Sequence, residues 1–597
     1  MNFKNIFLGI FGIAIFAGLT SCKKEFDRLS TNPNYPDPSK ADADLYLNQV
    51  QLSFNNFFAS TPSNLVNAHY SASDFGAQLT RQLNWTGPFY RNGYTPPSFD
   101  DEWIYAYASD PVYAINSGVI NNGLALVPLA QQSKKYVHSG IARVLMAYTL
   151  GTLVDDFGDV PFSQAALGTA STSPKVDPGA TAYASVQTLL DSAIADFAKP
   201  SASGPANDLF YPGGSSKDNY HSAYWTTLAK TLKLKYYMQA RLVDNTVASK
   251  VQALLTEDDL INDPSQDFVF NYGINLTSPD SRHPHYGLDY VSSGGVGEYL
   301  SNYFMWMVAS QKYGGVVNLT GDPRLRYYFY RQVKNYSWAN SQTCPCFVNS
   351  QFGGSNFPAW YPSVPDQTPY CVIGRGYYGR DHGDNSGAPP DGSFRTAWGV
   401  YPAGGQFDAD QFTTVNLGIG GAGAGINPIW LSSFTSFLEA EAALTLGVTI
   451  PQTDPRTALT NGVTTSINKV MAFPSTIGVT PSSSVVPSGS QVASYISLVQ
   501  SNYDTATTND SRLNIIMTEY YLALWGNGVE AYNNFRRTGK PNNMQPAVAV
   551  PDPGHFMRSF FYPSVFVNRN SNAPAQKNPG NAVDKVFWDN NPDDFIK

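Results

Sequence analysis

Apolar side chains recur at helical spacing through the first part of the chain. One stripe with the i, i+3, i+4, i+7 spacing of a helix that packs on one side consists of Ile141, Val144, Leu145 and Tyr148. Similar stripes begin at Val186 and at Trp225. The pattern predicts helices from about residue 41 to residue 255.

Beyond residue 255 the helical spacing fades, and glycine, proline, asparagine and aspartate cluster among scattered aromatic residues. Helical spacing returns at 434–446, 454–470 and 513–525. We therefore predict a mainly α protein in which a large, irregular, loop-rich insertion interrupts the helices. The expected layout is a helical scaffold at about 41–255 and 430–545, a loop-rich insertion at about 256–430, and an irregular C-terminal segment at 546–597.

The first 22 residues have the pattern of a secretory signal that ends in a cysteine. Lys4 precedes an apolar run of 14 residues, 6–19, which is too short to span a bilayer because a spanning helix needs about 20 residues. The small residues that lead into Cys22 resemble a bacterial lipobox, which implies acylation of that cysteine. We predict a signal peptide at 1–21 and a lipid-anchored, polar tether at 22–40.

The composition narrows the class of protein. With 597 residues, the chain is too long for one ordinary core. Its 38 Lys and Arg against 46 Asp and Glu give a net charge of −8, and no concentrated basic surface is visible, which argues against binding to nucleic acid. Charged residues make up only 14% of the chain, and aromatic residues also make up 14%. This low-charge, aromatic-rich composition is typical of an extracytoplasmic binding or processing protein.

Cysteine usage is compatible with that compartment. After acylation of Cys22, three cysteines remain, at positions 344, 346 and 371. A disulfide from Cys371 to Cys346, or to Cys344, would close a loop of about 25 residues. A free buried thiol fits the same sequence, and no histidine pair lies nearby at a spacing suited to zinc.

A turn-rich segment between two helical stretches is the best candidate for ligand binding. Sugars present flat C–H faces, which an exposed aromatic ring covers while nearby amide and guanidinium groups bind the hydroxyls. The alternative is that these aromatic residues hold the loop onto the core. The candidate residues here are Trp85, Phe89, Tyr90, Asn92 and Tyr94. Secondary candidates, each taken singly, are Trp306, Trp360, Tyr361, Tyr377 and Tyr378.

Two further motifs have features of cofactor sites. Asp381, Asp384 and Asp391 form an oxygen-rich loop that could hold calcium, but turn-forming side chains explain the loop without a metal. Gly418 to Gly423 formally matches a dinucleotide-binding fingerprint. Asn427-Pro428 follows where a helix should open, so we expect no nucleotide cofactor.

Several segments, in this order behind the lipobox, resemble the SusD/RagB family of nutrient-binding outer-membrane lipoproteins of Bacteroidetes. We interpret these segments as scaffold, with Asp159 capping neighbouring amides and with Arg536 and Arg537 pairing with Glu519 or Glu530. The matching segments are 32–34 (NPN), 153–162 (LVDDFGDVPF), 322–325 (DPRL), 437–443 (FLEAEAA) and 528–541 (GVEAYNNFRRTGKP).

Membership of this family implies a SusD-like fold, with four tetratricopeptide-like helix pairs as a scaffold and an irregular half that carries the ligand face. It also implies a partner, a SusC-like TonB-dependent outer-membrane transporter, and a position at the cell surface on a lipid anchor. We therefore expect a non-catalytic lipoprotein that binds oligosaccharide or polysaccharide fragments and delivers them to the transporter. The alternatives are a peptide-capturing member of the same family and a surface-anchored glycoside hydrolase.

Overall fold

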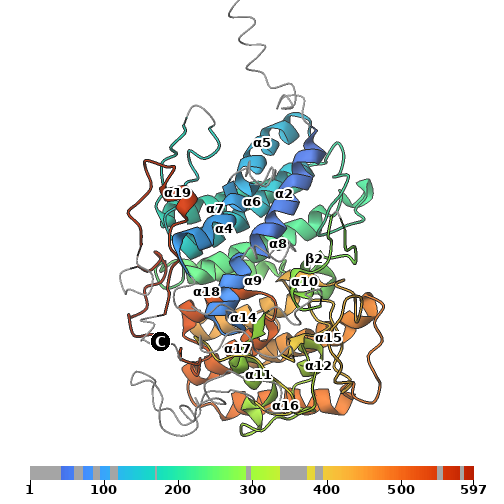
Figure 1. Cartoon of the computed structure of the whole chain (residues 1–597). Helices are drawn as coiled ribbons and strands as arrows, with labels where there is room; N and C mark the ends of the chain where they lie inside the picture. The colour runs from blue at the N-terminus through green and yellow to red at the C-terminus, as the bar shows by residue number, and fades with distance from the viewer. Residues whose placement is uncertain are drawn as a thin grey trace, which may run out of the picture.

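Helices dominate the structure, a computed structural model drawn in Figure 1. The structure describes residues 42–59, 71–84, 94–107, 118–167, 171–277, 279–290, 298–335, 373–383, 394–547, 556–577 and 584–596. These residues contain seventeen α-helices and only six short strands, so the prediction of a mainly α protein is confirmed.

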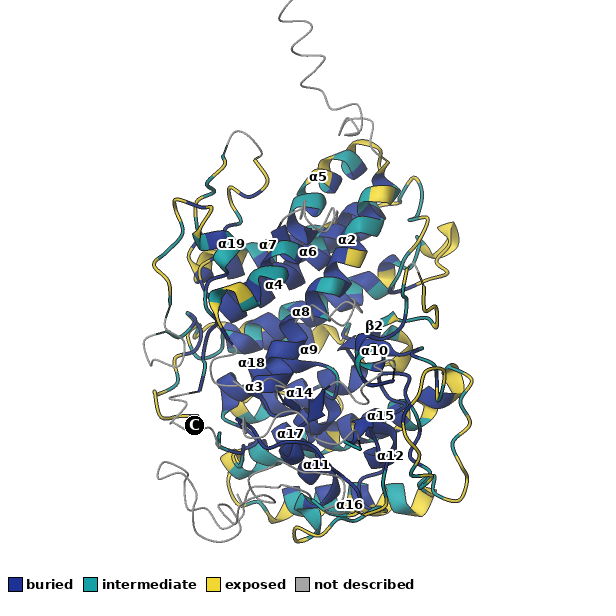
Figure 2. Cartoon of the chain, in the orientation of Figure 1, coloured by how far each residue is buried: buried dark blue, intermediate teal, exposed yellow. Residues whose placement is uncertain are grey.

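The first group of helices lies in the upper part of Figure 1. The 22-residue helix α6 is buried along nearly its whole length, because α2, α5, α7 and α8 pack around it. By composition α6 is the one helix among the described residues that could span a membrane, but 94% of its most apolar stretch is buried inside the protein. The helices of this group are α2 (Ala43–Phe58), α4 (Asp100–Tyr107), α5 (Val119–Gln132), α6 (Tyr136–Phe157), α7 (Gly179–Phe197), α8 (Ser222–Gln239) and α9 (Val247–Glu257). Helix α3 (Ala72–Leu79) follows α2 in the sequence but lies lower in the molecule (Figure 2), packed against α18 (Gly528–Thr538).

A second group of helices forms the lower part of Figure 1, where α14 packs against both α15 and α17. Side chains of polar residues cap several of these helices; Asp454, for example, accepts hydrogen bonds from two backbone amides at the start of α15. The helices are α14 (Ser432–Leu446), α15 (Pro455–Thr476), α16 (Gly489–Thr505), α17 (Asn509–Ala523) and α18 (Gly528–Thr538). The short helix α19 (Ser564–Val567) returns to the upper part of Figure 1, where it packs against α4.

Short elements fill the chain between the two groups, apart from β1, which follows α3. They comprise α10 (Pro284–Tyr290), α11 (Asn302–Ala309), α12 (Leu325–Tyr328) and the strands β1 (Leu83–Asn84), β2 (Phe268–Asn271), β3 (Tyr299–Leu300), β4 (Phe329–Tyr330), β5 (Ala397–Trp398) and β6 (Ile426–Trp430). The strands pair antiparallel as β1–β3, β2–β6 and β4–β5. Each pair joins residues far apart in the sequence, so these small sheets fasten loops to the helical scaffold.

A buried ion pair and buried hydrogen bonds connect the two groups of helices. Lys235 of α8 pairs with Glu530 of α18 at 2.9 Å, and Asn533 of α18 donates to Asp155 of α6 at 2.8 Å. Trp588, in the C-terminal segment, also donates to Asp155, at 2.9 Å. All of these side chains are buried. Figure 2 shows α18 in the dark blue of buried residues. Two of the segments that carry the family resemblance are therefore structural, as predicted.

Of the roles predicted for individual residues in these segments, one is confirmed and one is wrong. Asp159 Oδ1 accepts a hydrogen bond from the backbone N–H of Gly179, at the start of α7, at 2.8 Å, which confirms its capping role. The expected partner of Arg537 was wrong. Arg537 pairs with Glu441 of α14 at 2.6 Å, because α18 and α14 meet at this point, and Glu519 pairs with other residues.

Candidate functional site

The residues on either side of the predicted ligand loop are anchored in the core. β1 ends at Asn84, immediately before Trp85, and pairs antiparallel with β3. Asn84 lies opposite Tyr299 in this pair. At the other end of the loop, Tyr94 is buried and its hydroxyl donates to Gln78 Oε1 at 2.7 Å. The stem of the loop is therefore part of the scaffold.

A second segment with predicted site residues runs beside β3. The backbone N–H of Arg380 donates to the carbonyl of Leu300 at 3.0 Å, and that of Asn302 donates to the carbonyl of Arg380 at 2.9 Å. Asn84 Nδ2 donates to the carbonyl of Asp381 at 2.8 Å. The structure thus brings the segment with two of the predicted tyrosines against the stem of the predicted ligand loop.

The carboxylate of Asp381 has a structural partner. It is buried and accepts a hydrogen bond from Asn302 Nδ2 at 3.1 Å. The other predicted calcium ligands, Asp384 and Asp391, lie outside the described residues. Among the residues that the structure describes, no group of three or more His, Cys, Asp or Glu could hold a metal ion. Calcium binding at this loop stays a prediction.

Four of the predicted aromatic contacts lie in the interior of the described structure. Trp306, on α11, is 8% exposed and packs near Tyr303, with ring centroids 6.2 Å apart. Tyr377 is fully buried, and so is Tyr378, whose backbone N–H donates to Thr396 Oγ1 at 2.7 Å. These rings, like that of Tyr94, offer little surface to a ligand in this structure, and their contact with a ligand stays a prediction.

The remaining predicted site residues lie outside the described residues, and their roles stay predictions. They are the candidate ligand contacts Trp85, Phe89, Tyr90, Asn92, Trp360 and Tyr361, the candidate disulfide residues Cys346 and Cys371, with the alternative Cys344, and the lipidation residue Cys22.

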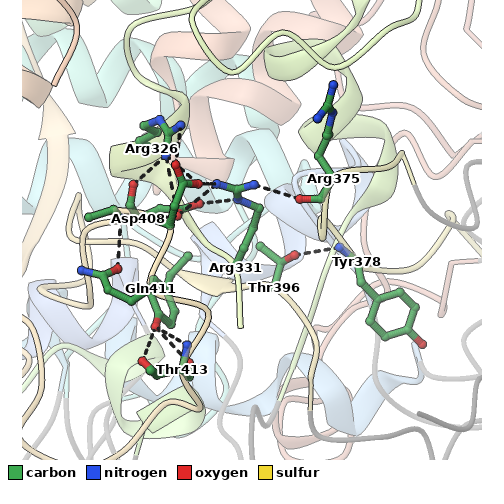
Figure 3. A network of polar contacts seen from close by, with 11 residues as sticks. Arg326, Arg331, Arg375, Tyr378, Thr396, Asp408, Gln411 and Thr413 are labelled. Atoms are coloured by element: carbon green, nitrogen blue, oxygen red, sulfur yellow. Dashed lines mark hydrogen bonds and ion pairs between the residues drawn. The ribbon is translucent and has the colours of Figure 1, made fainter. Parts of the chain in front are cut away.

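An ionic network lies beside the segment 373–383 and contacts it (Figure 3). Arg331 donates through Nε to Asp408 Oδ2 at 2.6 Å and through Nη2 to Asp408 Oδ1 at 3.2 Å, in a two-pronged contact. Its Nη1 donates to the backbone carbonyl of Arg375 at 2.9 Å. The same guanidinium lies 5.1 Å from the ring centroid of Tyr377. One buried arginine therefore fixes both the backbone and a ring of this segment.

The carboxylate of Asp410 in this network remains charged at neutral pH. Arg326 Nη1 lies 3.1 Å from Asp410 Oδ1, and Arg331 pairs with the same oxygen. Burial by itself would raise the pKa of the Asp410 carboxyl, but the two arginines hold that pKa below its ordinary value. The network is thus an assembly of paired charges that positions its neighbours.

The side chain of Arg375 points away from the network (Figure 3) and is exposed. It borders a shallow hollow of about 440 Å³ together with residues of the turn that follows the 3₁₀ helix η7 (Gln311–Tyr313). The lining residues are Tyr313, Val316, Val317, Asn318, Leu319, Thr320 and Arg375. A phenol ring, an amide and a guanidinium thus face one surface depression. We call it the Arg375 hollow.

The turn after Tyr313 depends on glycine. Gly314 and Gly315 have φ angles of 64° and 80°, in the left-handed region that residues with a Cβ atom rarely adopt. The ring of Tyr313 packs directly on Gly321, where an added Cβ would lie 2.3 Å from the ring. The glycines therefore let the chain fold back beneath the tyrosine ring and place it at the rim of the hollow.

A second contact between arginines and an aromatic ring lies at β3. The guanidinium carbons of Arg380 and Arg395 lie 4.5 Å and 4.0 Å from the ring centroid of Tyr299. Arg380 and Tyr299 are buried, so these contacts join the segment 373–383 to the strand that precedes α11. They reinforce the stem of the candidate site.

The glycine-rich stretch at 418–423 serves the protein's own packing. An added Cβ at Gly420 would lie 2.0 Å from the carbonyl oxygen of Gly405, so the two backbones touch. The strand β6, rather than a helix, follows this stretch. A nucleotide phosphate is bound at a helix N-terminus in the dinucleotide fold, and this stretch supplies none.

Sequence reasoning missed Tyr313, Asn318 and Arg375 as candidate contacts. The available signal was an aromatic residue directly before the turn at Gly314-Gly315. Arg375 carried no signal, because its proximity to Tyr313 arises from the contact of two segments about 60 residues apart.

Comparison with known proteins agrees with this architecture. One family model, described as "Starch-binding associating with outer membrane", matches residues 46–342, and a second, described as "Susd and RagB outer membrane lipoprotein", matches residues 424–575. No curated protein matches the chain.

Solved structures with the same fold cover almost the whole chain. A SusD homologue from Bacteroides fragilis has a TM-score of 0.58 at 16% identity and covers 92% of this chain and 99% of its own. A SusD/RagB family protein from Bacteroides thetaiotaomicron has a TM-score of 0.57 at 18% identity, with 92% and 99% covered.

A chitin-binding SusD homologue from Flavobacterium johnsoniae has a TM-score of 0.56 at 17% identity, with 92% of this chain and 100% of that chain covered. At these identities the structures establish a shared fold. Taken with the two family models and the buried motif segments, they establish that the chain belongs to the SusD/RagB family of outer-membrane lipoproteins.

Proposed function

We propose that this protein captures oligosaccharide or polysaccharide fragments at the cell surface, without catalysis, and delivers them to a SusC-like TonB-dependent transporter. The main support for a sugar ligand is the Arg375 hollow, where a tyrosine ring, an amide and a guanidinium line one surface depression. Its position beside the segments that carry the predicted aromatic contacts supports a single extended ligand face. Two solved relatives are described as chitin-binding, which supports a glycan as the ligand.

The chemistry of the hollow suits a sugar. A ring that buries about 60–100 Å² of apolar sugar surface contributes roughly 1.5–2.5 kcal/mol. The amide of Asn318 and the guanidinium of Arg375 supply hydrogen bonds to hydroxyl groups. After ordering costs, two or three such contacts give affinities between about 1 mM and 1 μM. Such affinities suit capture followed by transfer.

The absence of catalysis is part of the proposal. Hydrolysis of a glycosidic bond commonly requires two carboxyl groups flanking the bond. None of the described residues that line the Arg375 hollow is Asp or Glu. The same exposed arginine would pair with the carboxylate of a peptide, so a peptide ligand is the second candidate.

The membrane attachment and the partner complete the proposal. Acylation at Cys22 would hold the protein at the outer membrane, in keeping with the lipoprotein description of the matching family model. A transporter in the same membrane would then receive the captured ligand, because the family resemblance implies a SusC-like partner.

The test is calorimetric titration of the full-length chain with chitohexaose, maltoheptaose and a tryptic peptide digest, with reducing ends assayed in the same tubes. We expect heat with at least one glycan, no new reducing ends, and about a tenfold loss of affinity for Tyr313→Ala and for Arg375→Ala. Trp85→Ala probes the predicted loop in the same way.

Tyr46→Ala on α2 and Arg456→Ala on α15 are matched controls, because these residues are half-buried and do not line the hollow. New reducing ends would disprove the non-catalytic assignment. Heat with the peptide digest alone would assign the protein to peptide capture.

A further inference from the structure

A second hollow with aromatic walls lies away from the ligand face described above. It has a volume of about 230 Å³ and lies between β2, the start of α8 and α15. Figure 1 shows β2 well separated from α11, beside which the Arg375 hollow opens. All of its lining residues fall within 171–277 and 394–547, which the structure describes without a gap. We call it the Tyr224 hollow.

Three rings form one wall of the Tyr224 hollow. The rings of Tyr211 and Tyr224 lie 5.5 Å apart at 35°, and those of His221 and Tyr224 lie 5.2 Å apart at 39°. Tyr211 is buried, and its hydroxyl donates to the carbonyl of Gln266 at 2.8 Å. Tyr224 is half-buried, so part of its ring faces outward over a rigid base.

An acceptor and a donor lie side by side in the same hollow. The buried carboxylate of Asp267 accepts a hydrogen bond from the backbone N–H of Ser432 at 2.7 Å, and its other oxygen lies 2.8 Å from Lys469 Nζ. Asp267 is the one ion-pair partner of Lys469 among the described residues. An ammonium group has three N–H donors, so the others can face a ligand.

The wall that carries His221 is held in a rarely populated backbone conformation. Asn219, Tyr220 and His221 have φ angles of 48°, 58° and 60°, in the left-handed region that is unfavourable for residues with a Cβ atom. Asn219 Nδ2 offsets part of this cost by donating to the carbonyls of Phe197 and Lys199 at 3.2 Å and 3.0 Å. The structure therefore places His221 and Tyr224 by specific contacts.

We propose that the Tyr224 hollow binds one pyranose ring of a neutral glycan, as a second contact point remote from the Arg375 hollow. The rings would cover a C–H face, while Asp267 and Lys469 would bind neighbouring hydroxyls as acceptor and donor. The volume is below the 300–1,000 Å³ or so of pockets for drug-sized ligands, which limits the ligand to about one ring.

The balanced charges around the Tyr224 hollow favour a neutral sugar. Lys469 is paired with Asp267, and His221 Nδ1 lies 2.9 Å from Asp218 Oδ2. The hollow thus carries no excess of either sign that would favour an acidic or a basic sugar. The inference rests on the proposed glycan-binding function, because it extends that function to a second place on the surface.

The experiment uses the full-length chain with Tyr313→Ala and Arg375→Ala, so that the first hollow is disabled. Binding of methyl β-D-glucopyranoside and methyl N-acetyl-β-D-glucosaminide is measured by saturation-transfer NMR. We expect at least one glycoside to bind, and Tyr224→Ala in this background to weaken its binding at least fivefold.

Ser265→Trp is a second variant, in which an exposed rim residue is enlarged to fill the hollow without disturbing the core. We expect it to abolish the same signal, with an unchanged unfolding midpoint. The inference is overturned if neither glycoside binds, or if both variants leave the affinity within twofold of the background.

Titration of the native chain with chitohexaose and maltoheptaose keeps the two proposals apart. Glycan binding that depends on Tyr313 but is unaffected by Tyr224→Ala or Ser265→Trp would overturn this inference and leave the proposed function standing. Failure of every hexa- or heptasaccharide to bind the native chain would instead overturn the proposed function.

Discussion

The imidazole of His285 lies flat on the indole of Trp398, with ring centroids 4.1 Å apart and planes 12° apart. His285 Nδ1 lies 2.8 Å from Glu298 Oε1, which also accepts the indole N–H of Trp398 at 2.8 Å. Asp74 faces the other ring nitrogen at 3.4 Å. Burial would lower the pKa of His285, but Glu298 and Asp74 together raise that pKa to about 10.

This cluster predicts a pH dependence of stability. Because the folded-state pKa of His285 is raised, its contribution is complete below about pH 6.5 and is lost as the pH rises toward 10. We expect the unfolding free energy of the native protein to fall more steeply between pH 7 and 9 than that of His285→Gln, by up to about 1.4 kcal/mol per pH unit. Urea denaturation at several pH values measures both slopes, and parallel curves would contradict the prediction.

A buried pair of carboxyl groups predicts a pH dependence of stability in the acidic range. Burial raises the pKa of Asp156 to about 7, and burial together with Asp156 raises that of Glu102. A carboxyl group with a raised folded-state pKa contributes most at low pH, and the contribution is lost as the pH rises from about 4 to 7. We expect Asp156→Asn, which has no proton to lose, to flatten the decline in unfolding free energy over this range.

The matched control for the carboxyl pair is Asp191→Asn, because the side chain of Asp191 is 61% exposed. It should leave the slope between pH 4 and 7 unchanged. If Asp156→Asn and Asp191→Asn behave alike in urea denaturation, Asp156 does not retain its proton in the folded protein.

The Arg331 network links stability to ligand binding. Arg331→Met would leave the buried carboxylate of Asp408 without its principal partner, and breaking such a pair costs about 3–5 kcal/mol. It would also release the backbone of Arg375, so glycan affinity should fall with stability. Gln411→Ala, at an exposed residue of the same network, should change the unfolding free energy by less than about 0.5 kcal/mol. Chemical denaturation and calorimetry read the two effects, and an Arg331→Met protein of native stability would refute this role.

Helices α3 and α18 touch through glycine. A Cβ atom at Gly528 would lie 1.9 Å from the carbonyl oxygen of Ser73 and 2.2 Å from the amide nitrogen of Ala77. Gly528→Ala should therefore force the helices apart and lower the unfolding free energy by about 2 kcal/mol or more. Gly489→Ala, where an added Cβ meets nothing within 4 Å, is the matched control and should be neutral or slightly stabilising. Equal unfolding midpoints for the two variants would show that the close approach is not required.

Local patterns in the sequence were sufficient to predict many of the helices. The stripe at 141–148 lies within α6, and the helical spacing at 434–446 and 454–470 corresponds to α14 and α15. Such signals are reliable because the period of a helix is set within a few residues along the chain. The ordered motif segments, together with the signal pattern before them, were sufficient to identify the family. Two family models confirm that identification.

The candidate site was less accessible to sequence reasoning. Trp306, Tyr377 and Tyr378 are secondary candidates for ligand contact by residue type alone, and the structure buries all three, so their contact with a ligand stays a prediction. Composition cannot tell which face of a loop is covered, because the covering residues come from other parts of the chain. The partner of Arg537 was misjudged for the same reason, since Glu441 lies 96 residues away in the sequence.

By itself, the sequence determined the mainly helical character of this protein and its membership of the SusD/RagB family, because helical periodicity and ordered motifs are properties of neighbouring residues. Only the tertiary structure decided that Arg375 and Tyr313 border one hollow and that Tyr211, Tyr224 and Lys469 border another. Such sites depend on contacts between distant segments. Those contacts form because burying apolar surface and pairing charges stabilise one packing of the helices over others, and no local pattern records which packing that is.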